Sequence, residues 1–242
     1  MCGRIVSERL PEQLSLVFNA ELDPDVDPCQ CVGYNIPPTA RVLGLVAGPP
    51  ALARSIGWFR WGLGHRGSRS TPDRAVGGWF NARGETVGEK PAFRGAFATR
   101  RMLVLADGFY EWRVGPGRQR QPFYFHRADG QPLALAGLWE RGPEDAARLP
   151  GGAARLCAVV TTAANDDMDG VHDRMPVVVE PDGVDTWLDP ASHRRGALDA
   201  LVRAGPVGTL VCHPVSTRVG DVRHDDPSLV ERVEPVVPGT LF

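Results

Sequence analysis

Short apolar runs of strand length follow one another along most of this chain, and this pattern constrains its fold more than any other feature. Turns rich in Gly, Pro and Asp separate the runs, and few helical stretches lie between them. A doubly wound parallel sheet would need a crossover helix after nearly every strand. The pattern therefore predicts an α+β domain with mostly antiparallel strands. The expected strands are residues 2–6, 42–46, 55–63, 101–106, 122–126, 132–139, 156–162, 176–180 and 209–215; the expected helices are a stretch with Leu10, Leu14, Val17 and Phe18 on one face, then residues 91–99, 181–188 and 194–203.

The 242 residues could form one large domain or two small ones. No segment has the length of a domain linker, and the segments 64–74, 115–121 and 142–152 are typical of surface loops. A loop rich in Asp and Pro is expected over residues 23–39, and the chain becomes polar and Pro-rich after residue 221. We expect one domain over residues 1–226, followed by a C-terminal strap or tail over 227–242.

The compartment follows from two features. No run approaches the roughly 20 apolar residues that span a bilayer, and charged residues at positions 4, 8, 9 and 12 interrupt any signal peptide. The five cysteines (Cys2, Cys29, Cys31, Cys157 and Cys212) form no regular framework, which favours a reducing cytoplasm. We expect a monomer with no membrane attachment.

Cofactor motifs are missing from the sequence. Cys29-Gln30-Cys31 is half of a possible zinc site, but no second pair completes it. There is no phosphate-binding or dinucleotide-type glycine loop and no nucleophile elbow. We expect neither a metal nor a cofactor. The net charge of −2 gives no indication of nucleic-acid binding. Of the 27 basic residues 26 are arginines, and either the base composition of the genome or a local basic groove would explain that bias.

Cys2 directly follows Met1. If Met1 is removed, as small second residues usually permit, the chain begins with an α-amine (pKa about 7.7–8.0) beside a thiol (pKa about 8.5). The amine can condense with an aldehyde to an imine, and the thiol can close on the imine carbon to give a five-membered thiazolidine. The alternative is a cysteine at position 2 without a chemical role.

Two polar clusters could contact a nucleotide. In Tyr34-Asn35-Ile36-Pro37-Pro38-Thr39 the consecutive prolines fix an extended backbone that could support a base or a sugar, or simply a stiff loop. In Asn81-Ala82-Arg83-Gly84-Glu85-Thr86 the amide and the guanidinium could hold a sugar and a phosphate, or form a solvated turn.

Two further clusters suit proton transfer. Asp107-Gly108-Phe109-Tyr110-Glu111-Trp112 sets a carboxylate among three aromatic residues, where its pKa would rise; the alternative is a core strand with Glu111 in water. Val171-His172-Asp173-Arg174-Met175-Pro176 places a histidine beside an arginine, which fits acid–base work on an anionic substrate or a structural histidine.

In this order, the motifs resemble those of the SOS-response-associated peptidase (SRAP) family, whose members shield abasic sites in single-stranded DNA. The resemblance extends from Cys2 to about Asp226. It implies a compact fold with a barrel-like antiparallel core, a few flanking helices and a basic groove for single-stranded DNA. The motifs are Met-Cys-Gly-Arg, Tyr-Asn-Ile-x-Pro-Thr, Trp-Gly-Leu, Asn-Ala-Arg-x-Glu-Thr, Gly-Phe-Tyr-Glu-Trp and His-x-Arg-Met-Pro.

The resemblance also implies catalytic roles. Cys2 corresponds to the nucleophile that captures the sugar aldehyde. Glu111 corresponds to the acid–base carboxylate beside the amine, and His172 to the histidine that assists opening of the sugar ring. Asn81 corresponds to the asparagine that positions the abasic residue.

Six residues are expected to bind DNA. Arg4, Arg83 and Arg174 match the arginines that contact phosphates. Asn35, Trp112 and Thr161 are the further candidates. The partner implied is single-stranded DNA that contains abasic sites, and the setting implied is the DNA damage response in the cytoplasm, near the nucleoid.

The chain departs from the family pattern at Pro37, at Gly64-His65 and at Met102 and Leu105. These changes leave the reactive groups in place, but they alter the surroundings of the aromatic wedge expected near Trp61. Two other functions stay open: a cysteine peptidase using Cys2 with His172 or Glu111, and a passive single-stranded DNA-binding module.

Overall fold

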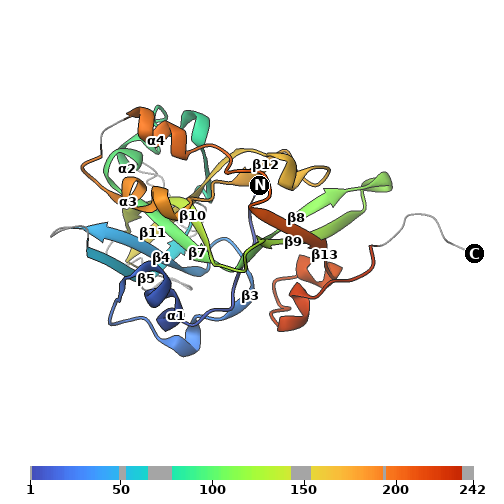
Figure 1. Ribbon diagram of the computed structural model, residues 1–242. Coiled ribbons are helices and arrows are strands. Elements are labelled where there is room, and N and C mark those ends of the chain that lie inside the picture. Colours follow the sequence, from blue (N-terminus) through green and yellow to red (C-terminus); the bar gives the residue numbers. More distant parts are fainter. Residues whose placement is uncertain (1, 49–52, 65–77, 143–153, 193–194, 236–242) are drawn as a thin grey trace, which may run out of the picture.

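The larger of two β-sheets closes on itself (Figure 1). We describe a computed structural model, in which residues 2–48, 53–64, 78–142, 154–192 and 195–235 can be described. This sheet has eight strands: β2 (Glu21–Leu22), β4 (Arg41–Gly48), β5 (Ala53–Trp61), β6 (Asn81–Arg83), β7 (Arg101–Ala106), β10 (Leu133–Arg141), β11 (Arg155–Ala163) and β12 (Arg174–Pro176). The strand order is β12-β11-β10-β7-β4-β5-β2, and a parallel pairing of β11 with β5 joins the middle strands into a ring.

The smaller sheet is entirely antiparallel and has the order β13-β9-β8-β1-β3. Its strands are β1 (Ile5–Ser7), β3 (Gly33–Ile36), β8 (Gly108–Val114), β9 (Arg120–Arg127) and β13 (Leu210–Pro214). Because β1 is paired with both β8 and β3, the start of the chain is fixed between two strands of this sheet.

Helices cover the outside of the ring. The α-helices are α1 (Pro11–Phe18), α2 (Arg94–Thr99), α3 (Val184–Leu188) and α4 (Arg195–Leu201). Short 3₁₀ helices are η1 (Pro28–Gln30), η3 (Gly84–Thr86), η4 (Pro116–Arg118), η6 (Asp166–Met168), η7 (Pro181–Gly183), η8 (Thr217–Gly220) and η9 (Pro227–Val230). Helix α1 begins with a proline, whose fixed φ suits the first turn, and is capped after Phe18 by Asn19, which adopts the left-handed conformation that asparagine tolerates.

Successive side chains of each ring strand point to opposite faces of the sheet, so the ring contributes to two hydrophobic cores. Leu43, Trp58 and Leu103 are among the side chains that face the helices. Their neighbours Val42 and Phe59 face inward and pack with the first residues of the chain and with β8. The inner core therefore reaches Cys2, and the ring forms the floor beneath the start of the chain.

The predicted fold class is confirmed, since within the described residues all strand pairs except β11–β5, β11–β6 and β2–β5 are antiparallel. Strands β4, β5, β7, β9, β10, β11 and β13, the helix at residues 11–18 and the loop around η4 lie where the sequence predicts them. The strand predicted over 176–180 is wrong: β12 ends at Pro176, and Val178 makes only an isolated bridge to Leu135. The loop predicted over 23–39 contains β3, and the first strand begins at Ile5, not at Cys2. The loops predicted at 64–74 and 142–152 fall, except for their first residues, outside the described residues.

The segment after η8 packs against the smaller sheet. Leu229 is fully buried beside Val6 and Tyr110, and the N–H of Val233 donates to the carbonyl of Pro214 (2.9 Å). The proposed boundary at residue 226 stays a prediction. None of the described helices is long and apolar enough to cross a membrane.

We predict that Gly108→Ala destabilises the fold. A Cβ at Gly108 would lie 2.5 Å from the carbonyl oxygen of Phe125, and a backbone atom cannot turn away as a side chain can. Overpacking of this kind costs about 1–3 kcal/mol, and each kcal/mol lowers Tm by about 2–4 °C in a domain of this size. Thermal unfolding checks the prediction against Gly48→Ala, where a Cβ meets nothing within 4 Å; equal Tm values for the two variants would contradict it.

Candidate active site

Cys2 lies fully buried where the chain enters the smaller sheet. The N–H of Tyr110 donates to the carbonyl of Arg4 (3.0 Å), which extends the pairing of β1 with β8 back toward Cys2. From the other side, Asn81 Nδ2 donates to the carbonyl oxygen of Cys2 (2.8 Å). Asn81 is held there because β6 pairs in parallel with β11, with Asn81 opposite Val159. The position of Cys2 is therefore fixed by both sheets.

Glu111 faces the inner core from β8. The pairing of Ile5 with Phe109 sets Glu111 opposite Gly3, on the face that Phe109 shares. The residue is only 3% exposed, so the prediction of a carboxylate in an apolar setting is confirmed over the alternative of a solvated one. Burial, and next the negative charge of Glu111, raise the pKa of the Cys2 thiol far above its ordinary value, while the Arg4 backbone N–H opposes the shift. The thiol is therefore neutral at pH 7.

His172 reaches the same carboxylate from the loop before β12. Its Nε2 lies 4.0 Å from Glu111 Oε2. The N–H of Arg174 donates to Nδ1 (2.9 Å), which places the proton of the neutral ring on Nε2, facing Glu111. Asp173 Oδ1 lies 2.9 Å from the same Nδ1, a contact that becomes attractive when the ring gains a second proton. The imidazole is thus oriented to exchange a proton inside the site.

Arg174 is anchored beside this histidine. Its guanidinium forms an ion pair with Glu85 and donates to the carbonyl (2.7 Å) and the hydroxyl (3.2 Å) of Thr161. The hydrogen bond from Arg174 lowers the pKa of Glu85, so the pair persists until the pH falls below the ordinary range of a carboxyl group. Thr161 is fully buried, so it holds the guanidinium of Arg174 by accepting these hydrogen bonds from within the protein.

Arg4 is anchored in a second network. Its Nη1 donates to Asn35 Oδ1 (2.7 Å) and to the carbonyl of Val219 (2.8 Å). Asn35 is 2% exposed and its Nδ2 donates to the carbonyls of Val219, Asp221 and His224, at 3.3, 3.1 and 2.7 Å. Asn35 therefore links the start of the chain to the segment after β13.

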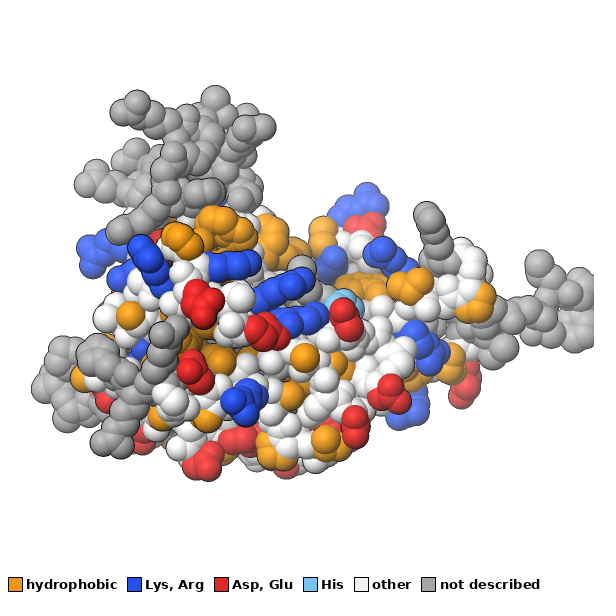
Figure 2. Space-filling model, turned by 90° about the horizontal axis from the view of Figure 1, so that it is seen from above, with side chains coloured by type: hydrophobic (Ala, Val, Ile, Leu, Met, Phe, Trp, Pro, Cys, Tyr) orange, Lys and Arg blue, Asp and Glu red, His pale blue; other side chains and the backbone are white. Residues whose placement is uncertain are grey.

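The remaining two candidates lie closer to the surface. Arg83 is exposed at the end of β6, and Trp112 is half-buried with its ring centroid 5.8 Å from the guanidinium carbon of Arg4. Figure 2 shows Lys and Arg side chains gathered in the middle of the face on which Figure 1 places the N-terminus and β12. This side of the molecule therefore carries positive charge near the start of the chain.

The structure thus brings together Cys2, Asn81, Glu111 and His172, as the sequence predicts, whereas it buries Asn35 and Thr161 behind arginines. The sequence did not predict three sets of contacts: that of Glu85 with Arg174, that of Asp173 with His172, and those of the backbone carbonyls after residue 218 with Arg4 and Asn35. Glu85 and Asp173 lie inside motifs of the sequence, but nothing in those motifs shows which arginine or histidine they contact. Among the described residues, no three His, Cys, Asp or Glu side chains are placed to hold a metal ion.

A sequence model of the SOS response associated peptidase (SRAP) family matches residues 1–222, which is most of the chain. The chain belongs to the SRAP family. Solved structures share the fold of this SRAP chain. A protein from Bacteroides thetaiotaomicron has the same fold, with a TM-score of 0.82 at 20% identity, covering 96% of this chain and 100% of the other. A phage-related protein from Bordetella bronchiseptica matches with a TM-score of 0.67 at 31% identity, covering 89% and 95%.

Curated relatives of this SRAP chain have names that state a role. YedK of Escherichia coli, an abasic site processing protein, is 29% identical over 96% of this chain and 100% of its own. YoqW of Bacillus subtilis, with the same description, is 29% identical over 82% of this chain and 85% of its own. HMCES of chicken, also an abasic site processing protein, is 30% identical over 74% of this chain and 58% of its own.

Proposed function

We propose that the protein captures abasic sites in single-stranded DNA through a covalent bond between Cys2 and the aldehyde of the opened sugar. One observation carries the proposal: the buried Glu111 lies beside Cys2 and within 4.0 Å of His172 Nε2. This arrangement supplies a nucleophile with groups that can donate and accept protons. The names of the relatives support the choice of substrate.

Removal of Met1, by the protein itself or by an aminopeptidase, comes first, because it creates the α-amine of Cys2. His172, once it carries a second proton, gives one to the ring oxygen of the closed sugar while Glu111 takes the proton of the anomeric hydroxyl; the ring C–O bond breaks and the aldehyde is exposed. The amine adds to the aldehyde carbon, and loss of one water leaves an imine. The thiol adds across the C=N bond: sulfur bonds to carbon, its proton moves to nitrogen, and a thiazolidine results. Glu111 accepts and returns the protons of these steps.

The arginines would hold the strand. We assign phosphate contacts to Arg4, Arg83 and Arg174, and stacking of a neighbouring base to Trp112, a contact worth about 1–3 kcal/mol. Asn35 and Thr161, proposed as DNA-binding residues, would serve by holding Arg4 and Arg174 in place. An abasic nucleotide has no base to unstack, so its entry into the site costs little. The product would shield the site from cleavage in the DNA damage response, in the cytoplasm where the nucleoid lies.

The decisive experiment compares a protein whose mature chain starts at Cys2 with one that keeps a residue in front of it, each verified by intact mass. Both are incubated with a single strand carrying an abasic site and separated by denaturing electrophoresis. We expect a heat-stable shifted band only with the free amine, and none with an intact strand. Equal capture by the blocked protein would refute the imine step.

A cysteine peptidase acting on proteins is the second candidate, since Cys2 shares its site with His172. Such enzymes attack as thiolates, and the raised pKa of the Cys2 thiol disfavours that species here. Turnover of unrelated peptides would support this candidate. A passive DNA-binding module would instead bind intact and abasic strands equally and form no covalent product.

A further inference from the structure

Arg113 lies on the same face of β8 as Glu111. Successive side chains of a strand point to opposite faces, so Glu111 and Arg113 share one face and Trp112 points to the other. Two residues advance a strand by about 6.6 Å, and Arg113 is exposed whereas Glu111 is buried. Arg113 is therefore the next side chain outward from the candidate site on the face that carries Glu111.

Two contacts agree with this placement of Arg113. Its guanidinium carbon lies 4.7 Å from the ring centroid of Phe123, and Phe123 is the direct partner of Glu111 on β9. Burial raises the pKa of the Cys212 thiol, and the charge of Arg113 is among those that oppose the rise. Cys212 packs against the inner core, so Arg113 lies on the side of the smaller sheet that carries the reactive groups.

The ring of Phe123 restrains the guanidinium of Arg113. A cation placed over an aromatic face is attracted by the electrons of the ring. The contact therefore limits the rotamers of a long side chain before any ligand arrives, and less conformational entropy is lost on binding. A guanidinium carries its five N–H donors in its own plane, so stacking on one face leaves these donors directed outward. The stack thus presents donors at the rim of the site.

The charges around this part of the sheet favour an anion. Of the three charged side chains that act on the Cys212 thiol, two are positive, Arg232 and Arg113. Arg232 is also exposed, in the segment after η9. The third is Asp167, whose carboxylate accepts two backbone N–H groups beside β13, at 2.6 and 2.9 Å. Those hydrogen bonds hold the one negative charge of the three at the start of β13.

The start of the chain leads to Arg113. The register of β1 with β8 sets Gly3 opposite Glu111. Because the two strands are antiparallel, the same register puts Cys2 one residue farther out, level with Trp112. Arg113 is the next residue of β8. A nucleotide joined to Cys2 would therefore have one of its neighbours in the strand beside Arg113.

We propose that Arg113 binds a phosphate next to the captured nucleotide, so that the strand leaves the site along the Glu111 face of the β8–β9 hairpin. The proposal rests on the proposed function. Figure 1 shows β8 and β9 extending together beyond the N-terminus, where they offer this face to a strand. A guanidinium suits phosphate oxygens because it can donate two parallel N–H bonds to them.

The test measures binding of an intact single strand, without an abasic site, as a function of salt. Each phosphate contact contributes about 0.7 to the slope of log K against log[salt]. We expect Arg113→Met to lower the slope by about that amount. Arg113→Lys should keep most of the slope, because the charge remains. An unchanged slope with Arg113→Met would overturn the proposal.

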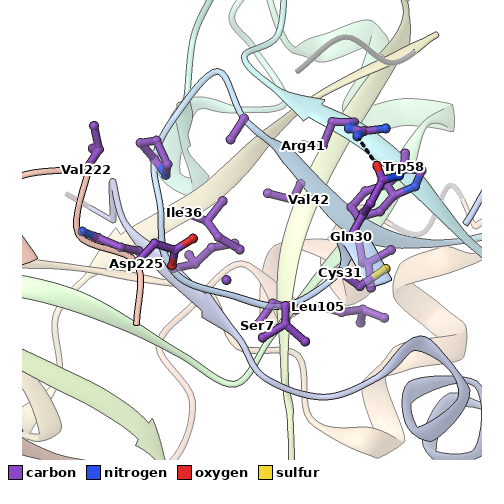
Figure 3. A pocket seen from close by; sticks show the side chains of 17 residues that line it. Ser7, Gln30, Cys31, Ile36, Arg41, Val42, Trp58, Leu105, Val222 and Asp225 are labelled. Atoms are coloured by element: carbon purple, nitrogen blue, oxygen red, sulfur yellow. Dashed lines mark hydrogen bonds between the residues drawn. The ribbon is translucent and has the colours of Figure 1, made fainter. Parts of the chain in front are cut away.

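Arg41→Met is the matched control. Arg41 on β4 is also stacked on an aromatic ring, with 4.9 Å between its guanidinium carbon and the ring centroid of Trp58. Trp58 belongs to the core that faces the helices. Figure 3 shows the pair beside Gln30, at one end of a cavity of about 260 Å³. Arg41→Met should leave the slope unchanged; a fall equal to that of Arg113→Met would reduce the effect to net charge and overturn the proposal.

Arg120→Met tests which face of the hairpin meets the strand. Arg120 is exposed on β9 and pairs with Val114, so it points to the same side as Trp112. We expect it to lower the slope less than Arg113→Met does, and an equal or larger fall would overturn the assignment to the Glu111 face. Covalent capture of abasic DNA is measured separately. Because the salt series uses an intact strand, a failure of capture leaves its result standing.

Discussion

Replacing Cys2 by alanine is expected to abolish the heat-stable band with abasic DNA. After Met1 is removed, the alanine variant keeps the α-amine and still forms an imine, but no thiol is present to close on the imine carbon. The imine hydrolyses during denaturation. Reduction with borohydride before denaturation should therefore restore a band with the variant. That result separates the role of the nitrogen from the role of the sulfur.

Two comparisons guard this prediction. Cys2→Ser supplies a hydroxyl that closes to an oxazolidine, a more labile ring, so its band should fade on heating. Binding of an intact strand should be nearly the same for all three proteins, since the phosphate-binding arginines are untouched. A heat-stable band with Cys2→Ala in the absence of reductant would contradict the thiazolidine mechanism.

Glu111→Gln should move two properties of the site in opposite directions. Loss of a general acid–base group slows proton transfer about 10²–10⁴-fold, and we expect capture to slow within that range. At the same time the charge that helps to raise the pKa of the Cys2 thiol disappears. The thiolate fraction at a given pH then rises, and alkylation of Cys2 by iodoacetamide should become faster. Capture is followed by electrophoresis and alkylation by mass spectrometry.

Glu140→Gln is the matched control, because Glu140 on β10 is a half-buried carboxylate paired with Arg100 (3.5 Å) and lies outside the site. It should leave both rates unchanged. If Glu111→Gln slowed capture and alkylation alike, the carboxylate would act by supporting the local structure. If it changed neither, Glu111 would have no part in the chemistry.

The sequence predicts best those strands and helices that a short local run of apolar residues marks. The run 102–106 is apolar throughout and, with Arg101 before it, becomes β7, which is buried along its whole length. By contrast, Gly33–Ile36 and Asn81–Arg83 contain polar or small residues and no apolar run. They become strands because β1 and β11 offer them backbone partners, and no short window of sequence contains both members of such a pair.

For the candidate site, too, local motifs indicate some residues, whereas the contacts of others appear only in the folded structure. Motifs in the sequence point to Cys2, Asn81, Glu111 and His172 as chemically able residues. They do not show that Asn35 and Thr161 are buried behind arginines.

The strand-rich fold class and the residue types available for reaction follow from the amino-acid sequence, because both depend on local composition and spacing. Which of those residues meet depends on how the chain folds. Cys2 and Asn81 are 79 positions apart and touch because β1 pairs with β8 while β6 pairs with β11. Hydrogen bonds between strands are made without regard to distance along the chain, so the proximity of reactive groups is a property of the folded molecule.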